Sequence, residues 1–71
     1  MSNESVYKVI EIVGTSDDSW EAATRAAVAT AGKSLRDLRV AEVVKQDVTI
    51  EDGAVSRFRV RLTLSFKYDT E

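Results

Sequence analysis

The first half of the chain changes from strand-like to helix-like composition. Residues 6–13 are rich in β-branched and aromatic side chains and end at Gly14, which predicts a strand followed by a turn. The alanine-rich stretch that follows, to about residue 31, predicts a helix with Ser16 as its N-cap and Gly32 as its stop. Residues at helical spacing form one face of this helix: Trp20, Ala23, Ala27, Val28 and Ala31.

Two long strands are predicted in the second half. Residues 38–50 and 54–68 flank Asp52-Gly53, and this pair is a strong hairpin signal. The second of these strands alternates apolar and polar residues along its length. The order of elements therefore predicts an α+β fold, β-α-β-β, with a three-stranded antiparallel sheet against one helix.

The hairpin turn also predicts which residues oppose each other. With Asp52-Gly53 at the centre of the loop, Asp47 faces Phe58 and Gln46 faces Arg59. One face of the sheet, expected to bury against the helix, then carries Ala41, Val43, Phe58, Val60, Leu62 and Leu64. The other face is mixed and carries Val40, Glu42, Val44, Gln46 and Val48 beside Arg57, Arg59, Arg61, Thr63 and Ser65. A one-residue bulge would break this assignment.

The mixed face and the short chain both point to assembly. A face that holds several valines among charges suits burial, yet the chain has no second helix to cover it. A chain of 71 residues buries only about 60% of the surface of its unfolded form. Small domains are commonly stabilised by disulfides, a structural metal or oligomerisation, and this sequence has no Cys and no His. We therefore expect a homo-oligomer, with an oxygen-ligated metal as the alternative.

Composition narrows the possible functions further. Without Cys or His, the chain has no thiolate or imidazole for metal binding, nucleophilic attack or base catalysis. Its 10 basic and 12 acidic residues argue against a protein that coats nucleic acid. Its apolar runs are too short to span a membrane, and its first residues do not resemble a secretory signal. We expect a soluble, cytoplasmic binding protein, one domain over residues 1–71 with tails at 1–5 and 69–71, and not an enzyme.

The element order and several short motifs resemble the dodecins. The resemblance covers residues 6–68 and rests on Val13-Gly14-Thr15-Ser16, on Ala41-Glu42-Val43 and on Ser65-Phe66. It implies a sheet wrapped partly around the helix and a hollow shell of twelve copies. It also implies the binding of flavins such as FMN, riboflavin or FAD in pairs, for storage and without turnover.

The positions that match the family's flavin site are altered in this chain. The family's stacking Trp corresponds to Val40, and a Gln that hydrogen-bonds the isoalloxazine edge corresponds to Arg59. A valine has no aromatic plane, and stacking contributes about 0.5–1.5 kcal/mol beyond area burial. We therefore expect a degenerate site, at Val40, Arg59 and their neighbours Gln46 and Glu42, with weak or absent flavin binding.

A branch described as calcium dodecins is more similar still, so the alternative function is a calcium-binding or other metal-binding assembly of twelve copies, or a purely structural one. It shares Ser19-Trp20-Glu21 at the helix start and Arg39-Val40-Ala41 in the second strand. Calcium requires six to eight oxygen ligands, which carboxylates of several copies supply where a symmetry axis gathers them. The candidate ligands are Asp47, Glu11, Asp17 and Asp18, with Glu42 as a further acid.

Simpler structural roles remain open for most of these residues. Asp17 and Asp18 suit charges at a helix start, and Trp20 suits a core or subunit contact whose indole N–H needs a partner. The arginines at 57, 59 and 61 suit either phosphate binding or pairing with carboxylates, such as Glu42, Glu51 or acids of neighbouring subunits.

Overall fold

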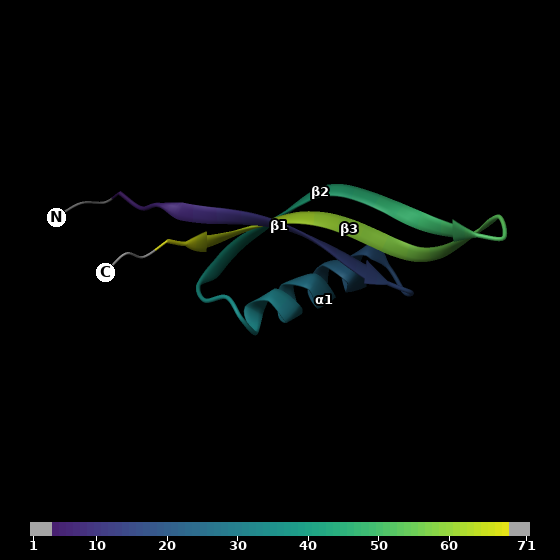
Figure 1. Ribbon diagram of the computed structural model, residues 1–71, viewed down its shortest axis with the longest axis horizontal. Helices are drawn as coiled ribbons and strands as arrows, with labels where there is room; N and C mark the ends of the chain where they lie inside the picture. Colours follow the sequence, from purple (N-terminus) through teal and green to yellow (C-terminus); the bar gives the residue numbers. More distant parts are fainter. Residues whose placement is uncertain (1–3, 69–71) are drawn as a thin grey trace.

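The chain folds as a three-stranded antiparallel sheet with one helix on a single face. The computed structural model describes residues 4–68; of the expected tails, residues 1–3 and 69–71 lie outside them. The elements are β1 (Tyr7–Ser16), α1 (Trp20–Gly32), β2 (Leu38–Glu51) and β3 (Ala54–Lys67), and β3 lies between the two other strands (Figure 1). The predicted β-α-β-β order is confirmed. Among residues 4–68, no helix is long and apolar enough to cross a membrane.

The helix begins later than the sequence predicts. β1 continues through Gly14 to Ser16, so the predicted turn at Gly14 is wrong, as is the predicted N-cap at Ser16. Ser19 is the N-cap, because its hydroxyl accepts a hydrogen bond from the Ala22 amide at 3.0 Å. The Ser16 hydroxyl instead accepts from the Asp18 amide at 2.9 Å, which forms a tight turn between strand and helix.

Two connections follow the local conformations that their residues favour. At the hairpin, Asp52 and Gly53 have φ values of 54° and 77°, which is the type I′ geometry that Asp-Gly favours, so the predicted turn is confirmed. Gly32 is the last residue of α1, and Lys33 caps the helix with right-handed φ of −72°. The left-handed residue of this connection is Asp37, with φ of 59°.

Gly14 allows the helix to pack directly on β1. A Cβ atom at this position would lie 2.8 Å from Ala27 Cβ and closer still to the Ala23 carbonyl oxygen. Ala23 and Ala27 are both buried against the strand, and the small side chains of all three residues permit this close approach. Gly14 is therefore a packing residue within a strand and not a turn residue.

The core is small and the molecule is elongated. Its buried residues are Ala23, Ala27, Val60, Leu62 and Leu64. The radius of gyration is 15.0 Å, against about 11 Å for a compact chain of this length. α1 lies mainly over β1 and β3, and both ends of the sheet extend beyond it (Figure 1). Val43, expected to bury against the helix, is 44% exposed because β2 lies at the uncovered edge.

Candidate functional site

The sheet has a second face, here called the outer face, that lies opposite α1. On β3, Val60, Leu62 and Leu64 are buried towards the helix, so the polar residues between them lie on the outer face. Pairing across the three strands places the outer-face residues in four rows, each with one residue from β1, β3 and β2 in that order. The first two rows are Val9, Ser65 and Val40, then Glu11, Thr63 and Glu42. The third and fourth rows are Val13, Arg61 and Lys45, then Thr15, Arg59 and Asp47. We call the second the acidic row and the third the basic row.

A β-bulge in β2 decides which side chains reach the outer face. The register shifts between Val43 and Lys45, so Val44 has no partner on β3. Glu42 faces Thr63 as predicted, but beyond the bulge Asp47 faces Arg59 and Gln46 faces Val60. The predicted pairs of Asp47 with Phe58 and of Gln46 with Arg59 are therefore wrong. Two further shifts, after Leu38 and after Thr49, complete the irregularities of this strand pair.

The bulge brings Asp47 and Arg59 into a two-point ion pair. Arg59 Nε donates to Asp47 Oδ1 at 2.8 Å and its Nη2 donates to Oδ2 at 3.1 Å. The hydrogen bond from Arg59 lowers the pKa of Asp47. The positive charges of Arg59, Lys45 and Arg61 lower it as well, whereas partial desolvation of the carboxylate raises it. The same hydrogen bond raises the pKa of Arg59. Both side chains are about two-fifths exposed, at 40% and 42%.

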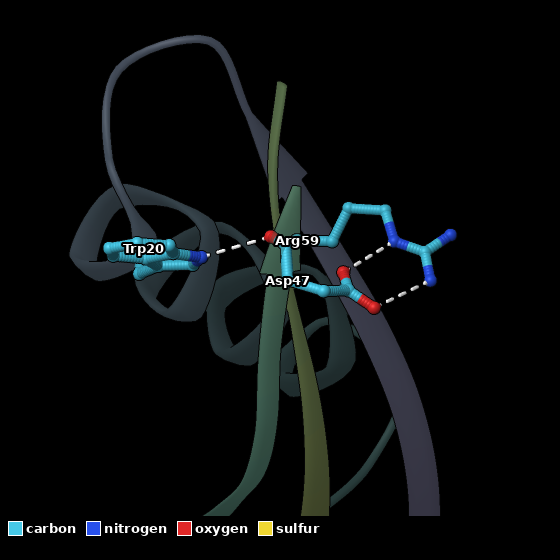
Figure 2. Close-up of polar contacts among 3 residues, drawn as sticks. All are labelled: Trp20, Asp47 and Arg59. Carbon is cyan, nitrogen blue, oxygen red and sulfur yellow. Dashed lines mark hydrogen bonds and ion pairs between the residues drawn. The ribbon is translucent and has the colours of Figure 1, made fainter. Parts of the chain in front are cut away.

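Asp47 also ties the helix to the hairpin. Trp20 Nε1 donates to the Asp47 carbonyl oxygen at 3.0 Å, and Figure 2 shows Trp20 and Arg59 reaching Asp47 from opposite sides of the strand. The Trp20 ring stands edge-on to Phe58, with centroids 5.2 Å apart and planes at 76°. Trp20 is thus a helix-to-strand contact, 36% exposed, and its indole N–H has found a partner.

The residues predicted for a flavin site do not all share one face. Val40 lies on the outer face opposite Ser65 and is 58% exposed, and Glu42 lies in the neighbouring acidic row. Arg59 is also on the outer face, two rows beyond Glu42 and bound to Asp47. Gln46 lies on the helix side of the sheet, opposite Val60, so its predicted place on the mixed face is wrong. No aromatic side chain stands in the row of Val40.

The four candidate metal ligands are spread over the molecule. Asp47 is bound to Arg59, and Asp17 lies 3.5 Å from Arg57 Nε. Glu11 lies in the acidic row, and Asp18 precedes the helix. Over residues 4–68 of one chain, no three acidic side chains gather into a group that could hold a metal ion.

The row of arginines is partly neutralised within the chain. Arg57 donates to Thr15 Oγ1 at 3.1 Å and lies beside Asp17, and Arg59 is bound to Asp47. Pairing with carboxylates was expected, but its partners are not Glu42 or Glu51. Sequence reasoning missed Asp47 as the partner of Arg59 because the bulge moves Asp47 to the outer face. The repeated valines Val43-Val44 give no sign of which one is extra.

Comparisons with known proteins agree with this fold. The family model for Dodecin matches residues 6–69. Calcium dodecin of Mycobacterium tuberculosis is 48% identical over 63 residues, which cover 89% of either chain. The structure of dodecin from Streptomyces coelicolor superimposes with a TM-score of 0.90 at 42% identity over all of both chains. A crystal structure of the M. tuberculosis calcium dodecin, described as having a novel calcium-binding site, has a TM-score of 0.82 at 45% identity over 94% of this chain and 96% of its own.

An elongated β-α-β-β unit with a single helix and an uncovered sheet face is typical of proteins that complete their core by assembly. The chain belongs to the dodecin family.

Proposed function

We propose that this protein assembles into a homododecameric shell that holds a small ligand without converting it. The elongated shape and the exposed outer face support assembly, because one chain leaves much apolar surface in water. The most exposed of the large apolar side chains lie at both ends of the sheet and along β2: Val6, Val9, Val40, Val44, Ile50 and Val55. Light scattering at low micromolar protein should give twelve times 7.9 kDa, and a monomer or dimer would contradict the proposal.

We infer that flavin binding is weak or absent in this shell. The observation that carries this is the ion pair between Arg59 and Asp47, because both donor positions of Arg59 that face Asp47 are already occupied. Arg59 keeps three further N–H groups, but the two-point pair holds its guanidinium on Asp47, so a flavin edge has to meet Arg59 in that position and beside a carboxylate. Val40 adds no aromatic plane on which an isoalloxazine could stack.

A flavin titration tests this inference. Riboflavin or FMN is titrated with the protein while flavin fluorescence is followed, and the parent should not quench it at submicromolar concentration. Val40→Trp combined with Arg59→Gln should restore quenching. Val55→Trp is the matched control, because it adds the same indole at an exposed hairpin position away from the site. Strong quenching by the parent would show that the two substitutions do not weaken the site.

Calcium is the second candidate ligand, favoured by the similarity to the M. tuberculosis calcium dodecin. The donor set of one chain fits calcium only in part, because Asp17 and Asp47 are engaged by arginines. Glu11 and Asp18 have no ion pair with any residue of 4–68 and would have to combine across copies to provide enough oxygen ligands.

Thermal unfolding with calcium and with a chelator tests the calcium proposal. A ligand bound by the folded form alone raises the midpoint, so millimolar calcium should raise it above the value in chelator. Glu11→Gln should abolish the difference, and Glu21→Gln, in the first turn of α1, is the matched control. Equal midpoints for the parent in calcium and in chelator would contradict calcium binding.

A further inference from the structure

The basic row places two cations against each other, and neither has an ion pair within residues 4–68. Lys45 and Arg61 are directly opposed partners on β2 and β3, on the outer face of the sheet. Like charges at opposed positions destabilise a sheet, whereas opposite charges would stabilise it. Within residues 4–68, no carboxylate lies within 4.0 Å of either side chain.

The bulge at Val44 creates this arrangement. Without the extra residue, Val44 would face Arg61 and Lys45 would lie on the helix side of the sheet. Bulges often re-aim side chains beside functional sites. The irregularity thus places a second cation beside Arg61 where a continuous strand would place a valine.

The acids nearest to the basic row leave the two cations available. In the acidic row, Glu11 and Glu42 flank Thr63 one step along the sheet, without an ion pair to Arg61 or Lys45. On the other side, both carboxylate oxygens of Asp47 accept hydrogen bonds from Arg59.

We propose that Lys45 and Arg61 bind the phosphate group of a small phosphate monoester. A phosphate monoester carries close to two negative charges, which match one lysine and one arginine, whereas a single carboxylate is satisfied by one guanidinium. Val13 beside Arg61 is 50% exposed and offers apolar surface for the body of the ligand. This site lies between the acidic row and the row of Arg59, and it goes beyond the proposed function because neither Lys45 nor Arg61 is a position of the flavin site.

Calorimetric titration of the assembled protein at low ionic strength tests the proposal. Phenyl phosphate should bind at millimolar concentration or below, inorganic phosphate more weakly, and benzoate not at all. Lys45→Gln and Arg61→Gln should each weaken phenyl phosphate binding by about tenfold or more. Lys67→Gln and Arg36→Gln are the matched controls, because each removes the same kind of charge elsewhere, and they should bind like the parent.

Two results would overturn the proposal. One is a parent that gives no binding heat with phenyl phosphate, or equal heats with benzoate. The other is an Arg61→Gln variant that dissociates in light scattering while Lys45→Gln binds phenyl phosphate like the parent, because Arg61 would then pair with a carboxylate of a neighbouring copy. Arg61→Lys keeps the charge and should retain most of the affinity, so it provides the measurement if Arg61→Gln does not fold. Since phenyl phosphate contains no flavin, a failure here is separate from the result of the flavin titration.

Discussion

Replacing Gly14 with alanine should weaken the contact between β1 and α1. The added Cβ would lie 2.8 Å from Ala27 Cβ and even closer to the Ala23 carbonyl oxygen, which belongs to the helix backbone. A backbone atom cannot turn away as a flexible side chain does, so the helix has to shift off the strand. The backbone of Gly14 itself imposes no penalty, because the residue does not have a positive φ.

The expected loss is about 2 kcal/mol of unfolding free energy. Overpacking a closely packed site costs about 1–3 kcal/mol, and a clash with two neighbours, one of them backbone, belongs near the upper end of that range. The lower entropy of alanine in the unfolded chain offsets about 0.4–1 kcal/mol of this. For a domain of this size, each kcal/mol moves the thermal midpoint by about 4–8 °C, so we expect a decrease of about 8–16 °C.

Thermal and urea unfolding, followed by circular dichroism at one protein concentration, measure this loss. The concentration is held constant because the unfolding midpoint of an assembling protein depends on its concentration. Gly32→Ala is the matched control: the nearest atom to its added Cβ is Leu38 Cδ1 at 3.9 Å, and alanine at the helix end adds up to about 1 kcal/mol. If Gly14→Ala were as stable as the parent, or moved the midpoint as Gly32→Ala does, the close packing of strand and helix would be refuted.

Three further changes test the rest of the structure. Trp20→Phe removes the donor to the Asp47 carbonyl but keeps a ring beside Phe58, and should lower the unfolding free energy by about 1 kcal/mol in urea titrations; no change would exclude a role for that hydrogen bond. Leu62→Ala, at a fully buried position, should cost about 2–5 kcal/mol, whereas Arg25→Ala at an exposed position of α1 should change stability by less than about 0.5 kcal/mol. Arg59 lowers the pKa of Asp47 in the folded state below the ordinary Asp value of 3.8. The free energy of unfolding of the parent should therefore exceed that of Asp47→Asn at neutral pH. This difference should vanish as the pH falls below 3.8 and through the folded-state pKa, where the carboxylate takes up a proton. A difference that persists in acid would show that the carboxylate charge is not its source.

The elements of the fold follow from local signals that are read within a few residues. The alanine-rich helix, the alternation of β3 and the Asp52-Gly53 turn depend on propensity, period and φ preference, and the structure has all three. The N-cap was misplaced because Ser16 and Ser19 carry the same hydroxyl and both precede helix-forming residues. The choice between them depends on how far β1 continues along β3, to the pair of Ser16 with Phe58.

The candidate site depends on register, which local signals do not settle. Val40, Glu42 and Arg59 were correctly placed on the outer face, because the predicted pairing holds before the bulge and Arg59 follows the alternation of β3. Beyond the bulge, Gln46 and Asp47 exchange faces. An extra residue in a strand of period two reverses every later side chain, and two adjacent valines conceal which one is extra.

The sequence by itself determined the β-α-β-β order and the hairpin turn. It also led to the expectation of partners, since 71 residues without Cys or His leave few other sources of stability. Only the tertiary structure decided that Gly14 is a contact between strand and helix, that Asp47 binds Arg59, and that Lys45 stands beside Arg61. The physical reason is that each of these depends on where distant segments come to rest against each other. A residue's face and neighbours are set by packing and strand pairing over the whole sheet, whereas its propensity is set by its own side chain.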